Sequence, residues 1–389
     1  FWAMGGFGLD IVAQSKRPSL SVRFSGTLKP EFSGEFDFEI FSIGPSRLLV
    51  DGEVLIDNWT SQDPGETFFA MGSAPKRGKI DFKEGQTYSL VIEYKWEGRF
   101  PAVQIGMQAP DQHDLMEEAM SLAQEADAVI LIAGTNSDWE TEGNDRASLD
   151  LPSNQDELIE KVCNLNKNTV VVLNTGSPCE MPWVDKANSI LQCWFPGQEF
   201  GNSLSDVLFG EVNPSGKLPT TFPKNLSDTP AYSTYPGKDL QMDYEEGLFI
   251  GYRWYDREEI EPLFAFGHGL SYTTFEYSNL RAVPPKGTSS VAAFELDITN
   301  SGNVFGKEIV QGYVKVSESK IDRPIKELKK FEKVSLKPGE SKKITFELTE
   351  RDLSFWSETN QSWQVEPAEY IFEVGASAID IKESTSVWL

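Results

Sequence analysis

Histidine and cysteine, the side chains that most often bind transition metals, are scarce in this chain. Its 389 residues include two histidines, His113 and His268, and three cysteines. Cys163, Cys179 and Cys193 lack the spacing of a metal site, and we expect them to be small buried hydrophobic residues. The composition therefore argues against a His-ligated metal and against a Ser-His catalytic triad.

Positive charge and long apolar runs are also in short supply. The chain has 35 Lys and Arg against 60 Asp and Glu, a net charge of -25. Phosphate binding needs clustered Lys and Arg, so this composition argues against a nucleic-acid partner and against an anionic membrane surface. No apolar run approaches the roughly 18–20 residues of a transmembrane helix. A neutral substrate such as a sugar is not repelled by an acidic surface.

The length allows two or three domains of roughly 100–200 residues each. In the first part, the apolar residues Phe36, Phe38 and Ile40 alternate with acidic residues, which indicates a strand with one buried face. Asp51-Gly52 lies between two apolar runs and predicts a hairpin, because this pair accepts the positive φ of a tight turn. Residues 1–109 are therefore predicted to form a β-sandwich or barrel.

The middle of the chain alternates helical and strand patterns, which predicts a layered α/β sandwich with parallel strands over residues 110–230. Residues 153–156, Ser-Asn-Gln-Asp, are expected to provide the N-cap of a helix that runs through Cys163. The predicted strands are 128–134, 169–173 and 189–194. The Gly- and Pro-rich stretch 197–237 is expected to run over the surface.

The last third returns to short alternating strands with turn signals between them. This pattern predicts a β-sandwich of immunoglobulin-like size over residues 276–389. Residues 231–275 are expected to be a linker and domain-junction segment. The predicted fold class is thus α/β plus all-β.

One acidic octapeptide stands out, Trp-Glu-Thr-Glu-Gly-Asn-Asp-Arg at 139–146. It follows the predicted strand 128–134, and ligands collect beyond the carboxyl ends of strands in α/β units. A carboxylic acid flanked there by an indole can have its pKa raised by desolvation, as the general acid of a glycosidase needs. Taken alone, the octapeptide fits a solvated acidic loop as well.

Five ordered segments resemble the carboxyl-terminal half of a glycoside hydrolase family 3 enzyme, of the fungal β-glucosidase type. They are residues 139–146 with 149–152, 195–202, 207–219, 244–253 and 264–272. Residues 322–328 with Phe331 resemble the terminal fibronectin type III-like sandwich of that family. The first hundred residues resemble the carboxyl-terminal part of its inserted domain, which is related to a domain of anthrax protective antigen.

The resemblance implies a retaining β-glucosidase that acts on β-glucosides or cello-oligosaccharides, with two carboxyl groups about 5–5.5 Å apart. It assigns the acid/base to the Glu directly before Gly in the octapeptide, which is Glu142. Glu140, two residues earlier in a backbone that is expected to be extended, is the runner-up. Trp139, Glu140 and Arg146 are predicted to belong to the substrate-binding site, where Trp139 and Arg146 are expected to shape the site and balance its charge.

Phe68 and Phe69 follow the predicted hairpin. By resemblance to inserted domains of this kind, they are expected to stack on the sugar beyond the scissile bond, since an aromatic face suits the apolar face of a pyranose. Packing in the core of their own domain is the other interpretation.

The nucleophile of the family is an Asp on an amino-terminal (β/α)8 barrel, and no segment here resembles that barrel. The chain begins Phe1-Trp2-Ala3 without an initiator Met, so it is interpreted as the interior of a longer product. We expect the barrel as a second chain or a missing segment, and this chain to be inert alone. Ser137-Asp138-Trp139 imitates the barrel's nucleophile motif but is interpreted as coincidence.

Several alternatives stay open at this point. Within the family they are a β-xylosidase and a β-N-acetylglucosaminidase, and outside it a non-catalytic carbohydrate-binding protein. A nucleotide-binding protein ranks third, because the glycines lack a phosphate-binding fingerprint, and no cofactor is expected. A homo-oligomer is an open possibility. Three sequons, at Asn58, Asn225 and Asn360, weakly favour secretion over the cytoplasm, and the cysteines do not.

Overall fold

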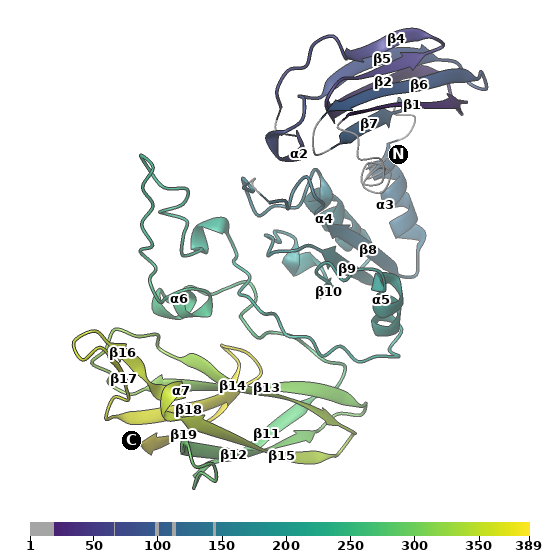
Figure 1. Cartoon of the computed structure of the whole chain (residues 1–389). Coiled ribbons are helices and arrows are strands. Elements are labelled where there is room, and N and C mark those ends of the chain that lie inside the picture. Colours follow the sequence, from purple (N-terminus) through teal and green to yellow (C-terminus); the bar gives the residue numbers. More distant parts are fainter. Residues whose placement is uncertain (1–18, 66, 98–100, 111–113, 143–144) are drawn as a thin grey trace. The chain divides into compact units, whose positions relative to one another are not determined.

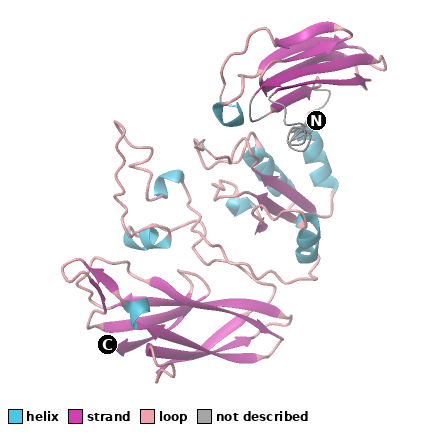
Figure 2. Cartoon of the chain, viewed as in Figure 1, coloured by secondary structure: helices cyan, strands magenta, loops and turns pink. Residues whose placement is uncertain are grey.

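The computed structural model describes residues 19–65, 67–97, 101–110, 114–142 and 145–389. Contacts divide the chain into two compact units, Phe1–Glu118 and Ala119–Leu389 (Figure 1). Strands predominate over helices in both, as Figure 2 shows.

The first unit contains two antiparallel sheets, with strand orders β1-β6-β3-β4 and β5-β2-β7. The strands are β1 (Ser19–Leu28), β2 (Gly34–Ile43), β3 (Ser46–Val50), β4 (Glu53–Asn58), β5 (Lys76–Phe82), β6 (Tyr88–Glu97) and β7 (Ala102–Gln108). Phe36, Phe38 and Ile40 on β2 are buried between them, as their alternation predicts. Asp51 and Gly52 both have positive φ between the paired strands β3 and β4, which confirms the predicted hairpin.

A buried polar cluster lies at the end of β4. The Nδ2 atom of Asn58 is within hydrogen-bond distance of the hydroxyls of Ser42 (3.2 Å), Ser46 (3.1 Å) and Ser73 (2.9 Å). Asn58 is fully buried, so its sequon cannot carry a glycan in this fold. That removes one of the three sequons on which the expectation of secretion depends; the other two asparagines are exposed.

The second unit begins with a three-stranded parallel sheet of order β10-β9-β8. Its strands are β8 (Val129–Gly134), β9 (Thr169–Asn174) and β10 (Ser189–Gln192), with helices α4 (Gln155–Leu165) and α5 (Phe200–Leu208) and the short η1 (Val184–Lys186); α3 (Leu115–Glu125) precedes β8 in the chain. Within the predicted cap at 153–156, Asn154 occupies the N-cap position of α4, which confirms the start of this helix, but its side chain makes no capping hydrogen bond. Leu131, Ile159 and Val171 pack in the core between sheet and helix.

The expected surface course of residues 197–237 is wrong for part of that segment. It contains α5, and it also contains Phe222, whose side chain is buried in the α/β core beside Trp194 and Phe264. The backbone N–H of Phe222 donates to the carbonyl of Phe264 (2.8 Å), and this long-range bridge draws the segment inward. Local Gly and Pro content cannot reveal a pairing over 40 residues.

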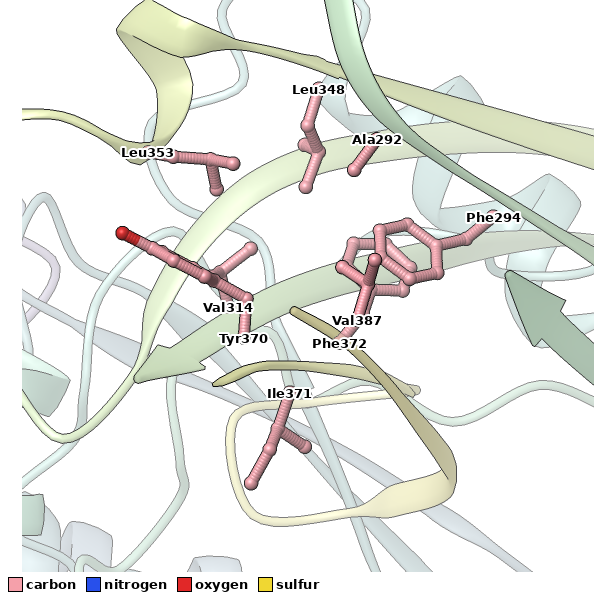
Figure 3. Close-up of a pocket in the computed structure, with 9 residues that line it drawn as sticks. All are labelled: Ala292, Phe294, Val314, Leu348, Leu353, Tyr370, Ile371, Phe372 and Val387. Atoms are coloured by element: carbon pink, nitrogen blue, oxygen red, sulfur yellow. The ribbon is translucent and has the colours of Figure 1, made fainter. Parts of the chain in front are cut away.

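The chain ends in a β-sandwich of two antiparallel sheets, β11-β12-β15 and β14-β13-β18-β19. Its strands are β11 (Phe275–Val283), β12 (Ser290–Asn300), β13 (Gly306–Val316), β14 (Glu327–Leu336), β15 (Ser341–Thr349), β18 (Glu369–Gly375) and β19 (Ile381–Trp388), with α7 (Glu350–Leu353) and the ribbon β16 (Phe355–Ser357) and β17 (Ser362–Gln364). Figure 3 shows side chains of both sheets converging on the core, where the rings of Phe294 and Phe372 stack at 4.2 Å. The predicted fold class, α/β plus all-β, is confirmed.

Buried polar contacts join the C-terminal sandwich to the preceding segment. Helix α6 (Tyr252–Arg257) presents the Tyr252 hydroxyl, which accepts from the backbone N–H of Leu328 (2.7 Å). Lys217 Nζ lies 3.1 Å from Glu308 Oε1, and the two side chains are 10% and 7% exposed. The same Nζ donates to the Gly269 carbonyl (2.8 Å), so one ammonium group links three segments.

His268 lies beside this ion pair, with its ring stacked on Phe264 at 5.3 Å. Burial, and then the charge of Lys217, lower the pKa of His268 below its ordinary value, while Asp380 opposes them. The unfolded chain therefore takes up a proton at about pH 6.5, and the folded chain only at lower pH. It follows that His268 reduces the free energy of unfolding as the pH falls through this window.

We expect His268→Phe to remove that loss of stability. Urea unfolding at pH 7.5 and pH 5.5 should show a smaller decrease for His268→Phe than for the wild type. Other titrating groups are common to both proteins and cancel in the comparison. An equal decrease in both proteins would contradict the assignment.

Candidate active site

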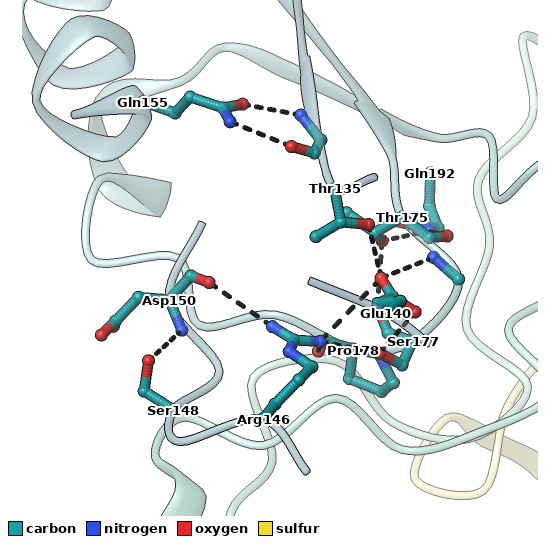
Figure 4. A network of polar contacts seen from close by, with 12 residues as sticks. Thr135, Glu140, Arg146, Ser148, Asp150, Gln155, Thr175, Ser177, Pro178 and Gln192 are labelled. Carbon is teal, nitrogen blue, oxygen red and sulfur yellow. Dashed lines mark hydrogen bonds and ion pairs between the residues drawn. The ribbon is translucent and has the colours of Figure 1, made fainter. Parts of the chain in front are cut away.

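The loop that carries the acidic octapeptide starts at the carboxyl end of β8. Gln155, the first residue of α4, fixes this strand end: its Oε1 accepts from the Gly134 N–H (2.7 Å) and its Nε2 donates to the Gly134 carbonyl (2.9 Å) (Figure 4). The chain then turns, since the N–H groups of Trp139 and Glu140 both donate to the Asn136 carbonyl (3.0 and 2.9 Å). The extended backbone expected at Glu140 is therefore wrong.

Glu140 is held by the protein on both carboxylate oxygens. Thr135 Oγ1 (2.5 Å) and the Gly176 N–H (3.0 Å) donate to its Oε1, and Ser177 Oγ donates to its Oε2 (3.1 Å). The side chain is 15% exposed, and Arg146 Nη1 lies 4.0 Å from Oε1. These contacts fix the carboxylate; the substrate-binding role stays a prediction.

Arg146, at the C-terminal end of the octapeptide, holds that end of the loop in place by hydrogen bonds. Its Nη1 donates to Ser177 Oγ (2.7 Å) and to the Pro178 carbonyl (3.4 Å), and its Nη2 donates to the Asp150 carbonyl (3.4 Å). Asp145, next to it, accepts a hydrogen bond from the hydroxyl of Tyr235, which raises the pKa of that tyrosine. The charge-balancing role predicted for Arg146 fits its place beside Glu140.

Glu142 lies in the sequence between Glu140 and Arg146, whose side chains are both held by hydrogen bonds. Its side chain is exposed, and among the described residues it has no hydrogen-bond or ion-pair partner. Trp139, three residues earlier, is 37% exposed, so the described part of the chain covers its indole only partly. Gly143 and Asn144 lie outside the described residues. In the part of the loop that the structure describes, the place of this carboxylate is thus set by the backbone and not by a side-chain partner.

Sequence reasoning missed the second loop of this site, residues 175–178, which follows β9. It supplies the Gly176 N–H and the Ser177 hydroxyl to Glu140. The rule that singled out the octapeptide, a position just past a strand's carboxyl end, applies equally to these residues. Applied to every predicted strand, it would have brought the two loops together.

Two known protein families match most of the sequence of this chain. The profile of the glycosyl hydrolase family 3 C-terminal domain matches residues 56–272, more than half of the chain. The chain belongs to glycosyl hydrolase family 3. A fibronectin type III-like domain matches residues 308–378, within the C-terminal sandwich.

Proteins named β-glucosidase are among its family 3 relatives. A probable β-glucosidase I of Aspergillus terreus is 38% identical over 99% of this chain and 49% of its own length. A β-glucosidase of Rhizobium radiobacter is 39% identical over 95% of this chain and 46% of its own. The chain spans about half the length of these relatives.

Solved structures of β-glucosidases are similar to this chain in both fold and sequence. The β-glucosidase of Kluyveromyces marxianus, solved in complex with glucose, superimposes with a TM-score of 0.88 at 36% identity and covers 96% of this chain and 45% of its own. A family 3 β-glucosidase of Bifidobacterium adolescentis covers 72% of this chain and 42% of its own at 42% identity, with a TM-score of 0.68.

The remaining predicted site residues, Phe68 and Phe69, belong to the first unit of this family 3 chain. They lie in the short helix α2 (Thr67–Ala70), where Phe68 has φ of 50° and its ring lies 5.4 Å from that of Phe41. The side chain of Phe69 lies outside the described residues. The contact with Phe41 fits packing within the domain, and stacking on sugar stays a prediction for both residues.

No group of three or more His, Cys, Asp or Glu residues could hold a metal ion in the described part of the chain. The cysteines are unpaired; Cys163 and Cys179 are buried, as expected, and Cys193 is only partly so. Burial raises the pKa of the Cys179 thiol to about 12. In the residues that the structure describes, no helix is both long and apolar enough to cross a membrane.

Proposed function

We propose that this chain forms the carboxyl-terminal part of a retaining β-glucosidase and that Glu142 is its acid/base. The observation that carries the proposal is the exposed carboxylate of Glu142, which has no partner among the described residues, on a loop fixed at both ends at the carboxyl end of β8. The names of the family 3 relatives support glucose as the sugar. "Full-length protein" below means this chain together with its amino-terminal portion.

Glu142 has two tasks in this mechanism. It first gives its proton to the glycosidic oxygen while the nucleophile forms a covalent bond to the anomeric carbon, and then takes a proton from the water that hydrolyses this intermediate. The described residues contain no (β/α)8 barrel. We therefore place the nucleophile, an Asp about 5–5.5 Å from the acid/base, on the amino-terminal portion.

Exposed apolar side chains of the second unit support the proposal that this unit binds the amino-terminal portion. On β8, Ile130 and Ile132 are 50% and 57% exposed, whereas Leu131 and Ala133, which alternate with them, are buried. Parallel sheets are normally covered on both faces. Large exposed apolar surfaces mark interaction sites, and the amino-terminal portion is the occupant that we propose.

A comparison of the full-length protein with residues 1–389 alone tests this function. We expect hydrolysis of p-nitrophenyl β-glucoside by the full-length protein only, with β-glucose as the first anomer seen by NMR. Faster hydrolysis of a β-xyloside or a β-N-acetylglucosaminide would favour those alternatives. Binding of cello-oligosaccharides without turnover would indicate a non-catalytic carbohydrate-binding protein, and α-glucose as the first product would contradict the retaining mechanism.

Phe68→Ala and Phe69→Ala are expected to raise KM for cellobiose in the full-length protein with little change in kcat. Loss of an aromatic contact worth about 0.5–1.5 kcal/mol corresponds to roughly a 2- to 12-fold increase. Phe24→Ala is the matched control, because Phe24 is a surface aromatic of the same unit, 42% exposed on β1. If neither Phe68→Ala nor Phe69→Ala differs from this control, the stacking role is wrong.

A further inference from the structure

We infer that Ser177 is a positioning residue for Glu142, because its hydroxyl joins the two ends of the loop that carries the acid/base. This inference rests on the proposed function of Glu142. It gives a mechanistic role to a residue of the second loop, which follows β9 and lies 35 positions further along the chain.

The Ser177 hydroxyl lies between the side chains of Glu140 and Arg146 (Figure 4). It donates to Glu140 Oε2 (3.1 Å) and accepts from Arg146 Nη1 (2.7 Å). A hydroxyl can do both at once. Glu140 comes two residues before Glu142, and Arg146 comes four residues after it. A single side chain thus bridges the entry and the exit of the loop.

Both hydrogen bonds involve a charged partner, which makes them stronger than neutral ones. Glu140 and Arg146 are 15% and 14% exposed, and their charges lie 4.0 Å apart. Their attraction alone would leave the distance between the loop ends loosely defined. The hydroxyl between them sets a particular geometry, because each of its bonds is directional.

The second loop, residues 175–178, which carries Ser177, is itself held in place by several contacts. The Thr175 hydroxyl donates to the Ser177 carbonyl (2.9 Å), and Pro178 follows directly. A Cβ at Gly176 would lie 2.6 Å from Glu140 Oε2 and 2.6 Å from the Phe195 ring. The Glu140 carboxylate therefore packs directly on the backbone of this loop, with no room for a side chain in between.

The position of Glu142 depends on the second loop, because the Glu142 side chain has no partner of its own in the described part of the chain. An acid/base must lie within hydrogen-bond distance of the oxygen that it protonates. A displacement of about 1 Å can lower the rate about 100-fold. Loss of the Ser177 bridge should therefore impair proton transfer specifically.

Substrates with different leaving groups separate this effect from a general loss of structure. The 2,4-dinitrophenolate group leaves without protonation, whereas phenolate needs a proton from Glu142. In the full-length protein, we expect Ser177→Ala to lower kcat/KM for phenyl β-glucoside by about 10- to 100-fold. We expect less than about a threefold change for 2,4-dinitrophenyl β-glucoside, because kcat/KM reports only the first chemical step for that substrate.

Ser177→Thr should restore most of the activity, since it keeps the hydroxyl. Ser148→Ala is the matched control: the Ser148 hydroxyl accepts from the Asp150 N–H (3.3 Å) near the same loop but does not bridge its ends. If Ser177→Ala folds poorly, Ser177→Cys provides the second variant, because a thiol of similar size is a much weaker hydrogen-bond partner.

The outcomes distinguish this inference from the function on which it rests. Equal losses on both substrates for the Ala and Cys variants, or a Thr variant no better than Ala, would overturn the positioning role. If Glu142→Gln shows the leaving-group dependence and Ser177→Ala does not, the inference is wrong and the function stands. If Glu142→Gln shows no such dependence, the proposed function itself is wrong and the inference fails with it.

Discussion

Glu142→Gln in the full-length protein should lower kcat/KM for phenyl β-glucoside by about 100- to 10,000-fold, the range that general acid catalysis contributes. Gln has nearly the same shape but cannot transfer a proton. Because Glu142 is exposed and unpaired among the described residues, the substitution should leave the free energy of unfolding within about 0.5 kcal/mol. Steady-state kinetics and urea unfolding measure the two effects.

Glu140→Gln is the matched control, with the same chemical change two residues away. It leaves a partly buried site whose donors were arranged for a carboxylate, so stability should fall. Azide provides a second distinction. It should restore turnover of 2,4-dinitrophenyl β-glucoside by Glu142→Ala, since the anion needs no base to attack the glycosyl intermediate. Normal rates for Glu142→Gln, or azide rescue of Glu140→Ala alone, would reassign the acid/base.

Among the substitutions proposed for this chain, Lys217→Met should cause the largest decrease in the free energy of unfolding. Removal of the cation leaves the Glu308 carboxylate, 7% exposed, without its partner at 3.1 Å. Loss of one partner of a buried ion pair costs about 3–5 kcal/mol. Differential scanning calorimetry and urea unfolding should both detect this change, which concerns the junction between the C-terminal sandwich and the segment before it.

The double variant Lys217→Met/Glu308→Leu should recover much of the loss, because replacing a whole buried pair by apolar groups is often close to neutral. Lys224→Met is the matched control. Lys224 pairs with Glu261 at 2.5 Å on the surface, where the side chains are 44% and 81% exposed, and we expect no measurable change. If Lys217→Met is no more destabilising than Lys224→Met, the junction does not depend on this pair.

The sequence predicts best where structure follows from local pattern. Strict alternation identified β2, and Asp51-Gly52 identified the hairpin that follows it. The polar residues 153–156 identified the start of α4. In each case the residues that form the element are neighbours in the chain, so periodicity and turn chemistry contain the necessary information.

Long-range contacts account for what the sequence could not predict. The burial of Phe222 depends on a bridge to Phe264, and that of Asn58 depends on three serines from other segments. The two loops of the candidate site meet only because β8 and β9 are parallel neighbours. Motif and strand position pointed to Glu142, and the strand-end rule could have pointed to the 175–178 loop, but the hydrogen bonds of Ser177 are visible only in the structure.

The most direct test of the central claim is to locate the glycosyl–enzyme intermediate. A 2-deoxy-2-fluoro-β-glucoside with an activated leaving group should trap it in the full-length protein, because the fluorine slows the second step more than the activated first step. Peptide mapping by mass spectrometry then identifies the labelled carboxylate. We expect the label on an Asp of the amino-terminal portion, with none on residues 1–389. A label on Asp138, or on any other carboxylate of this chain, would contradict the account.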